Sequence, residues 1–457
     1  MSFIFPLFFI EIVGIFFMTV LIKKKRYDYS IPELLSLSFF LGMVFISFQT
    51  LFFYLCGIDL DLANSVAVPS IMLLLVIARY AGRPERLKEF KRRSITDKWT
   101  VLEKILVLGI VLQLFWTVFL VFPTPIHSHD AVANYAMKAK MMYTFGNIPQ
   151  GFFSLSEATV SHPDYPPLLP FLLNWIYSFT GFNDLTANMI MPVIFLAFLT
   201  LFYSLLKKTL KRIHALLIVF LFATIPQVYD YATIIHADLI LTAFITAALA
   251  YFISYIRTGN RIEALLSFFL FGGSLWIKNE AIVFTGAFIL IFIAYFFKCQ
   301  KDEKRRVSRD LISGIILIAV LAAPWFFVKA CQSVPNSDMD LSALTPAHFL
   351  QNVKDIPIIL DLFQQEVFGP KKWNIFWILI FACAVWKRKA LWKNDIFYVT
   401  AFILLAAAGY FAGYMLTTGN NLFFYVNTTI SRFMLHFTGI AMLLLAGLCG
   451  DDWTSNL

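Results

Sequence analysis

Long apolar runs recur along the entire chain, and short polar stretches separate them. A helix that crosses the hydrocarbon of a bilayer needs about 20 mostly apolar residues. By that measure the sequence holds about 13 candidate spans, whose boundaries are least defined in 262–297 and 373–386. The spans are expected near residues 2–22, 33–55, 63–80, 101–122, 186–206, 213–230, 238–256, 262–277, 281–297, 311–330, 373–386, 395–416 and 430–448. The pattern predicts an all-α fold, a polytopic bundle of transmembrane helices.

Composition agrees with this pattern and removes other classes of protein. Of the 457 residues, 60% are hydrophobic and 14% are charged, whereas soluble domains have roughly 45–50% apolar and about 25% charged residues. Disordered chains, collagen-like rods and small disulfide-rich scaffolds do not have such a composition. The five cysteines show no CxxC spacing that would suggest a metal or redox centre. The chain is therefore expected to be integral to a membrane.

The net charge of +9 points to orientation in a membrane rather than to nucleic-acid binding. Most of the 37 Lys and Arg residues fall in short blocks between apolar runs. Such residues are enriched in the cytoplasmic loops of membrane proteins, so the blocks mark the cytoplasmic side. They are 23–26, 83–98, 207–212, 257–261, 298–309 and 387–393. With these blocks inside, the N-terminus is expected outside and the C-terminus in the cytoplasm.

One further apolar stretch, 166–182, is expected not to cross the membrane. If it crossed, the block 207–212 would face outwards and every later loop would be inverted. We therefore predict a juxtamembrane helix in the outer interface, begun by a Pro-Pro pair. Two long outer segments result, 123–185 and 331–372. Long connections of this kind are usually functional.

Ionisable residues gather at the span ends that are predicted to face outwards. A charge near the centre of a membrane costs about 2.5–3.5 kcal/mol on insertion scales, so charges in or beside spans are functional candidates. Each has a structural alternative, because an acid can simply favour a helix start and an arginine can reach lipid headgroups. The candidates are Asp130, Lys138, His162, Asp164, Tyr165, His236, Asp238, Lys278, Glu280 and Arg432. A metal site held by His129, Asp130 and His162 is a further hypothesis.

Four stretches resemble motifs of the GT-C membrane glycosyltransferases, which include the protein O-mannosyltransferases and the aminoarabinose transferases that modify lipid A. Residues 130–146, DAVANYAMKAKMMYTFG, are similar to the first outer-loop motif of that family. Residues 162–168, HPDYPPL, resemble the start of its juxtamembrane helix. Residues 237–241, ADLIL, look like its second acidic motif, and 278–281, KNEA, like its Lys-containing turn. The four stand in the family's order on the predicted outer face.

The resemblance covers about residues 101–300 and divides the chain into three parts. Residues 1–100 form an N-terminal segment of three spans, which precedes the matching module. Residues 101–300 form the GT-C-like catalytic module with the outer loop 123–185, and 301–457 form C-terminal spans with the outer loop 331–372. One acid flanked by His129 stands where the family usually has an acidic pair.

The resemblance implies an inverting transfer of a sugar from a polyprenyl-phosphate-linked donor to an acceptor at the extracytoplasmic face. Asp130 is the expected general base, which takes the acceptor's proton, and Asp238 is expected to orient the acceptor or a metal. Lys278, Arg432 and Lys138 are expected to stabilise the leaving phosphate, a role that a divalent metal could also fill. The other residues expected to contact substrate are His162, Asp164, Tyr165, His236 and Glu280. The expected partners are the lipid-linked donor, membrane lipids and an unspecified acceptor, with no nucleic acid.

Two alternatives remain open at this level. A polysaccharide polymerase or ligase of the O-antigen type is also polytopic with a large outer loop, but Arg and His rather than Asp would be expected at its site. A transporter of lipid or solute should carry ionisable residues near the bilayer midplane and corresponding broken segments in two halves. The candidates of this chain lie at span ends instead, and Glu11 is the exception within a span.

Overall fold

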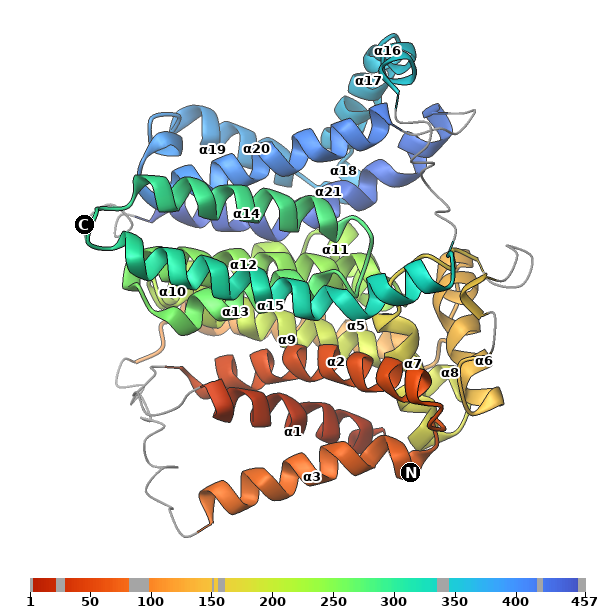
Figure 1. The fold of residues 1–457 in the computed structure, drawn as a ribbon. Helices are drawn as coiled ribbons and strands as arrows, with labels where there is room; N and C mark the ends of the chain where they lie inside the picture. The colour runs from red at the N-terminus through yellow and green to blue at the C-terminus, as the bar shows by residue number, and fades with distance from the viewer. Residues whose placement is uncertain are drawn as a thin grey trace.

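The computed structural model describes residues 3–21, 29–81, 98–149, 152–154, 161–334, 345–416 and 422–450. Within these ranges the regular structure is entirely helical, with no strand. The long helices lie side by side and roughly parallel in one bundle (Figure 1). Ten of the described helices are long and apolar enough to cross a membrane, or eleven if one bent pair of helices counts as a span. The polytopic all-α fold is confirmed.

The helices fall into a long and a short set. The long helices are α1 (Ile4–Leu21), α2 (Ile31–Cys56), α3 (Leu62–Tyr80), α5 (Val101–Val121), α9 (Ile190–Leu206), α12 (Ala237–Thr258), α14 (Ala281–Lys298), α15 (Lys304–Cys331), α20 (Asn394–Met415) and α21 (Leu422–Cys449). The shorter ones are η1 (Ala131–Ala136), α6 (Met137–Phe145), η2 (Phe152–Ser154), α7 (Leu168–Thr180), α8 (Asp184–Asn188), α10 (Arg212–Ala223), α11 (Pro226–Thr233), α13 (Arg261–Ser274), α16 (Pro346–Val353), α17 (Ile356–Val367), α18 (Pro370–Trp373), α19 (Phe376–Trp386) and η4 (Ala390–Trp392). Side chains at the helix starts explain several boundaries. The Thr100 hydroxyl and the Glu103 carboxylate, for example, each accept a bond from the other residue's backbone N–H and so cap α5.

Three predicted spans are not single full-length helices. The span expected at 262–277 is α13 with 14 residues, and the one expected at 373–386 is α19 with 11 residues. The span expected at 213–230 is α10 followed by α11, bent by 68°. Pro226 begins α11, and its ring leaves no N–H with which α10 could continue. The described part of the chain therefore has ten or eleven spans by length, fewer than the 13 expected.

The helix α7 corresponds to the stretch that was expected not to cross. It has 13 residues, fewer than the roughly 20 that a span needs. It lies at the same end of the bundle as α6 and α8 (Figure 1), and following the predicted orientation we call this end the outer end. Nearly all of its residues are buried, and Trp175 Nε1 donates to the Pro6 carbonyl at 3.1 Å. Protein rather than lipid therefore covers most of this helix.

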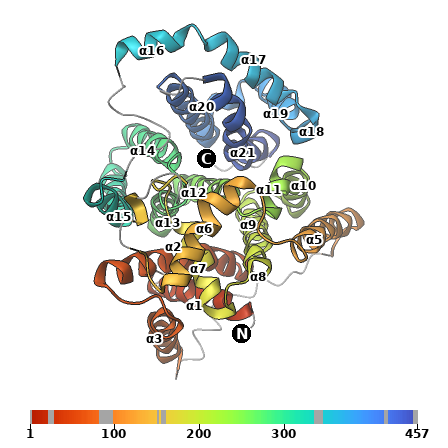
Figure 2. The same ribbon diagram turned by 90° about the vertical axis from the view of Figure 1, so that its right-hand side faces the viewer.

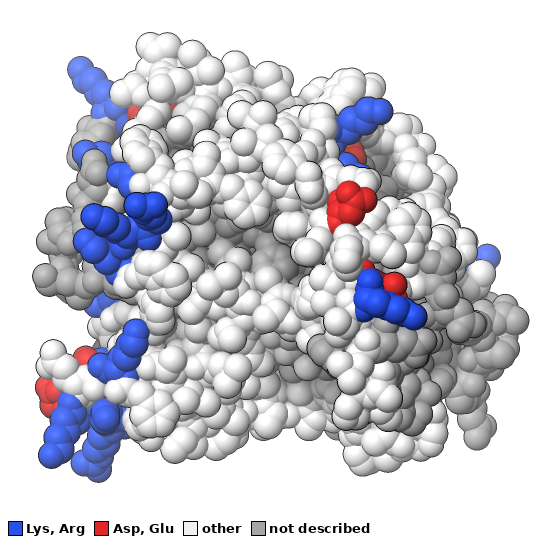
Figure 3. All heavy atoms as spheres, turned by 90° about the horizontal axis from the view of Figure 1, so that it is seen from above, with Lys and Arg blue, Asp and Glu red and all other residues white. Residues whose placement is uncertain are grey.

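The basic residues are distributed unevenly between the two ends of the bundle. On the face seen in Figure 3, most Lys and Arg side chains gather at the end opposite α6 and α8. The outer end of that face shows fewer basic side chains, which lie near carboxylates. This distribution is typical of a protein whose basic end faces the cytoplasm. The side of the membrane on which the outer end lies stays a prediction.

The helix α12 stands at the centre of the bundle. Seen along the bundle from the outer end, other helices surround it (Figure 2). Nearly all of its residues are buried, and it packs against α9, α13 and α21. Its first turn includes the buried Asp238. Any ionisable group there is enclosed by protein and needs partners in place of water.

Candidate functional site

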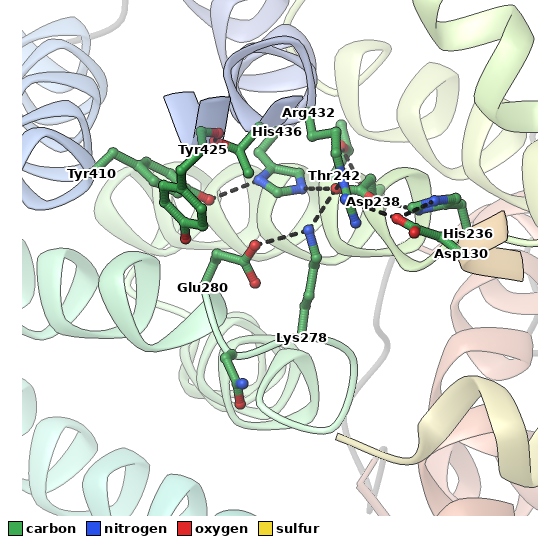
Figure 4. A network of polar contacts seen from close by, with 12 residues as sticks. Asp130, His236, Asp238, Thr242, Lys278, Glu280, Tyr410, Tyr425, Arg432 and His436 are labelled. Atoms are coloured by element: carbon green, nitrogen blue, oxygen red, sulfur yellow. Dashed lines mark hydrogen bonds and ion pairs between the residues drawn. The ribbon is translucent and has the colours of Figure 1, made fainter. Parts of the chain in front are cut away.

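Four separate parts of the chain bring the candidate residues together at the outer end of the bundle (Figure 4). Asp130 immediately precedes η1, and α12 begins beside His236 with Asp238 in its first turn. Lys278 and Glu280 come from the turn between α13 and α14. Arg432 comes from α21. The predicted convergence of these distant positions is therefore present in the folded chain.

The carboxylate of Asp238 is the centre of the network. Lys278 Nζ donates to its Oδ1 at 2.8 Å, and His436 Nε2 lies 3.0 Å from the same oxygen. His236 Nδ1 lies 2.5 Å from Oδ2, and Arg432 Nε donates to Oδ1 at 3.5 Å. The side chain of Asp238 is 0% exposed. A fully buried carboxylate persists as an anion only with such a set of donors, so the network stabilises the charge that it surrounds.

Asp130 shares two of these partners but is more accessible. Arg432 Nη1 donates to its Oδ2 at 3.0 Å, and His236 Nε2 lies 3.5 Å from that oxygen. The side chain is 34% exposed, in contrast to Asp238. The hydrogen bond to His236 and the charge of Arg432 hold the pKa of the Asp130 carboxyl well below its usual range, against the opposing effect of partial burial. Asp130 is thus an ionised carboxylate that a ligand can reach.

The guanidinium of Arg432 connects the two carboxylates and keeps one donor group unused. Its Nη1 contacts Asp130 and its Nε contacts Asp238. The third nitrogen, Nη2, is buried and has no hydrogen-bond partner among the described residues. An unsatisfied buried donor of this kind costs free energy unless a ligand satisfies it. The arrangement therefore favours an anion beside Arg432.

Lys278 and Glu280 form a second ion pair on the opposite side of Asp238. Lys278 Nζ lies 2.8 Å from Glu280 Oε1 and is shared with Asp238. The Lys278 side chain is only 2% exposed, and that of Glu280 is 22% exposed. Because two carboxylates face this ammonium, its charge is balanced and its direction is fixed.

His436 and Tyr410 belong to the network and were not among the residues predicted from sequence. His436 is fully buried, and its Nδ1 lies 2.7 Å from the Tyr410 hydroxyl. It stands four positions after Arg432, a spacing that places both side chains on one face of α21. A histidine inside an apolar span is itself a functional candidate. These two signals together could have identified it.

Four other predicted site residues form a neighbouring cluster at the same end. Lys138 is 3% exposed, and its Nζ donates to the His162 carbonyl at 2.5 Å. The His162 ring stacks on Tyr165 with centroids 4.5 Å apart. Asp164 is fully buried and accepts a hydrogen bond from Asn279 Nδ2 at 3.0 Å. Burial lowers the pKa of the Lys138 ammonium to about 7, against the attraction of Asp164.

The three residues proposed to hold a metal do not form one ligand group. His129 Nδ1 lies 3.6 Å from Asp130 Oδ1, with its own side chain 89% exposed, whereas His162 packs against Tyr165. Across the ranges that the structure describes, no group of three or more His, Cys, Asp or Glu is arranged to hold a metal ion. The central carboxylates already face Lys and Arg. Because these cations already occupy the carboxylate oxygens, the donor set does not fit a divalent metal held by carboxylates.

Comparison with known proteins supports the class that the motifs suggest. Residues 162–332 match the family described as Dolichyl-phosphate-mannose-protein mannosyltransferase. No curated protein and no solved structure matches the chain. The family match, together with ten apolar helices, supports a membrane glycosyltransferase of the GT-C kind. It covers less than half of the chain and includes Asp238 and Lys278 but neither Asp130 nor Arg432.

Proposed function

We propose that this protein transfers a sugar from a polyprenyl-phosphate-linked donor to an acceptor at the extracytoplasmic face of the membrane, with inversion at the anomeric carbon. One observation carries the proposal: a partly exposed, ionised Asp130 contacts Arg432, and another guanidinium nitrogen of Arg432 has no partner in the described part of the bundle. A base for the acceptor and a cation for the leaving phosphate are the two groups that such a transfer needs. The localisation follows from the basic residues at the opposite end.

Asp130 is the general base of the proposed reaction. The acceptor's oxygen attacks the anomeric carbon, and its proton passes to a carboxylate oxygen of Asp130. The bond between the anomeric carbon and the phosphate oxygen breaks, and its electron pair leaves with the polyprenyl phosphate. A positioned base contributes about 10²–10⁴ in rate. Because the pKa of Asp130 is lowered, its carboxylate is ionised and can accept a proton when the acceptor arrives.

Arg432 and Lys278 stabilise the phosphate as it gains charge. Arg432 Nη2 is buried and has no hydrogen-bond partner within the ranges that the structure describes, so a phosphate oxygen can accept from it. Lys278 is almost fully buried in the same network, where a low dielectric strengthens its field. Preorganised donors of this type need no rearrangement when charge develops. The donor's apolar chain would remain in the surrounding lipid.

Asp238 holds Lys278 and Arg432 in position and does not itself contact the substrate. Its side chain has no exposed surface, and Lys278, His436, His236 and Arg432 all face its oxygens. A carboxylate so enclosed has no free side for an acceptor. We therefore give Asp238 a positioning role, in which it fixes the cations and the imidazole that contacts Asp130.

The decisive experiment measures sugar transfer in proteoliposomes from a panel of radiolabelled polyprenyl-phosphate sugars. Asp130→Asn is expected to lower the transfer rate by about 10²–10⁴-fold. Asp61→Asn is a matched control, because Asp61 lies before α3 and caps Asn64 N at 2.7 Å, a bond that asparagine also accepts. Retained transfer in Asp130→Asn would remove the base assignment. Failure of the folded wild-type protein with every donor in the panel would remove the proposed function.

A further inference from the structure

The turn that carries Lys278 receives much of its support from outside its own helices. Lys278 lies after the end of α13 and before the start of α14. The backbone N–H groups at 275–277 reach back to the last turn of α13, and those at 281–283 begin α14 through i→i−3 bonds. Residues 278–280 therefore join the two helices, and their carbonyls accept the first bonds of α14. The position of the Lys278 ammonium therefore also depends on residues outside α13 and α14 that contact this turn.

Residues 162–168 hold the turn from that side through two hydrogen bonds. Leu168 N donates to the Trp276 carbonyl at 2.9 Å. Asn279 Nδ2 donates to Asp164 Oδ2 at 3.0 Å, and Asp164 is fully buried. The paired prolines at 166 and 167 fix two backbone angles between these contacts. The turn is thus attached at positions on both sides of Lys278.

The same segment is attached to the helix that follows Asp130. Asp130 immediately precedes η1, which continues into α6. From α6, Lys138 Nζ donates to the His162 carbonyl, and Lys329 Nζ on α15 donates to the Asp164 carbonyl at 3.5 Å. Residues 162–164 therefore join the part of the chain that follows Asp130 to the turn that carries Lys278.

We infer that Asp164 and Asn279 are positioning residues that set the distance between the general base Asp130 and the ammonium of Lys278. The inference rests on the proposed function. Asp164 acts through Asn279, which stands between Lys278 and Glu280 and cannot shift without moving both. Lys138 is correspondingly a support for this segment rather than a ligand of the phosphate. Small displacements of reacting groups, of about 1 Å, cost about 10²-fold in rate.

The test is a set of substitutions read by turnover in proteoliposomes. Asp164→Ala and Asn279→Ala are expected to lower kcat by about tenfold or more, while the KM for the acceptor changes little, because reacting groups are misplaced. Asp164→Asn is expected to retain most of kcat, since its amide oxygen still accepts from Asn279. Asn352→Ala is the matched control, because it removes a buried amide bond to the Met415 carbonyl between α16 and α20. An equal loss of kcat in that control, or none in Asp164→Ala, overturns the inference.

Epistasis separates positioning from general stability. In a Lys278→Ala background, Asp164→Ala is expected to cause less than about a twofold further loss, because its effect passes through the missing ammonium. Additive losses overturn the inference and leave the proposed function intact.

If the wild-type protein transfers no sugar, hydrogen exchange still tests the attachment. Faster exchange at 276–281 in Asp164→Ala than in Asn352→Ala supports it, and equal exchange overturns it.

Discussion

The Arg432 guanidinium lies 3.0 Å from the carboxylate of Asp130, although 302 positions of sequence separate the two residues. The cation proposed to bind the phosphate, Arg432, is thus hydrogen-bonded to the proposed base, Asp130. In the proposed reaction the phosphate accepts from Nη2, so Nη1 can keep its contact with Asp130.

Removing Arg432 is expected to change both the rate and its pH dependence. Arg432→Gln should lower the transfer rate by about 10²–10³-fold, as observed when one donor to a transition-state oxyanion is lost. Arg432 also helps to lower the pKa of Asp130. Without it that pKa rises, so activity should be lost at a higher pH as the solution is acidified. The pH profile of kcat/KM measures this shift, with Lys140→Gln as a control outside the site. An unmoved acid limb would contradict the Arg432–Asp130 coupling.

His436 is expected to matter more than its partner Tyr410. His436→Ala removes a donor from the buried Asp238 and leaves the Tyr410 hydroxyl without its 2.7 Å partner. Each unsatisfied buried group costs about 1–3 kcal/mol, so the melting temperature and the transfer rate should both fall. Tyr410→Phe removes only the hydrogen bond between Tyr410 and His436. It should therefore have the smaller effect on the melting temperature and on the transfer rate. Thermal unfolding in detergent and turnover measure this order, and equal effects would contradict it.

The buried Lys138 should make stability depend on pH in a specific direction. Its pKa falls from 10.5 to about 7 in the folded protein. The unfolded chain therefore binds more protons between these values, and the contribution of Lys138 to stability rises as the pH increases from about 7 to 10.5. Below about 7 both states are protonated and the cost of burying the charge is fully present. Below about pH 7 the melting temperatures of the wild type and Lys138→Met should change with pH in parallel. Between about 7 and 10.5 the melting temperature of the wild type should rise relative to that of Lys138→Met. Parallel curves throughout would contradict the prediction.

Close packing of α21 on α12 is expected to hold Arg432 and His436 in place. A Cβ atom at Gly439 would lie 2.0 Å from Thr246 Oγ1 of α12. Gly439→Ala should therefore push the two helices apart or force Thr246 to rotate, and lower both the melting temperature and the transfer rate. Gly286→Ala is the control, because a Cβ at that helical position meets nothing within 4 Å. That substitution should be neutral or stabilise by about 0.5–1 kcal/mol. Equal effects of the two substitutions would contradict this role of the contact.

Much of the fold could be predicted from the sequence, because an apolar run long enough to cross a bilayer satisfies its backbone hydrogen bonds there by forming a helix. The positions of helices such as α2, α12 and α21 follow from such runs. The charge blocks also separated α7 from the true spans, since a crossing there would have inverted the block at 207–212. Pro226 is visible in the sequence, but a single span was expected at 213–230. The size of the bend depends on how α11 packs.

Membership of the candidate site was predicted only in part. Asp130, Asp238, Lys278 and Arg432 stood out because charges beside apolar spans need a reason. His436 was missed, although its place in an apolar span four positions after Arg432 could have identified it. Its contacts with Asp238 and Tyr410 exist only in the folded chain. Asp164 and Lys138 were expected to contact substrate, and the structure places them in a neighbouring cluster around the His162 and Asp164 carbonyls.

The sequence by itself determined that this chain forms a membrane bundle and that its ionisable residues stand at helix ends, because the cost of exposing polar groups to hydrocarbon acts on each segment separately. Only the tertiary structure decided which of those residues meet. It placed Asp238 at the centre with no exposed surface and left Asp130 partly open. That difference arises from the packing of α12 against α21 and the turn at 278–280, and contacts between segments so distant in sequence are fixed only when the whole bundle assembles.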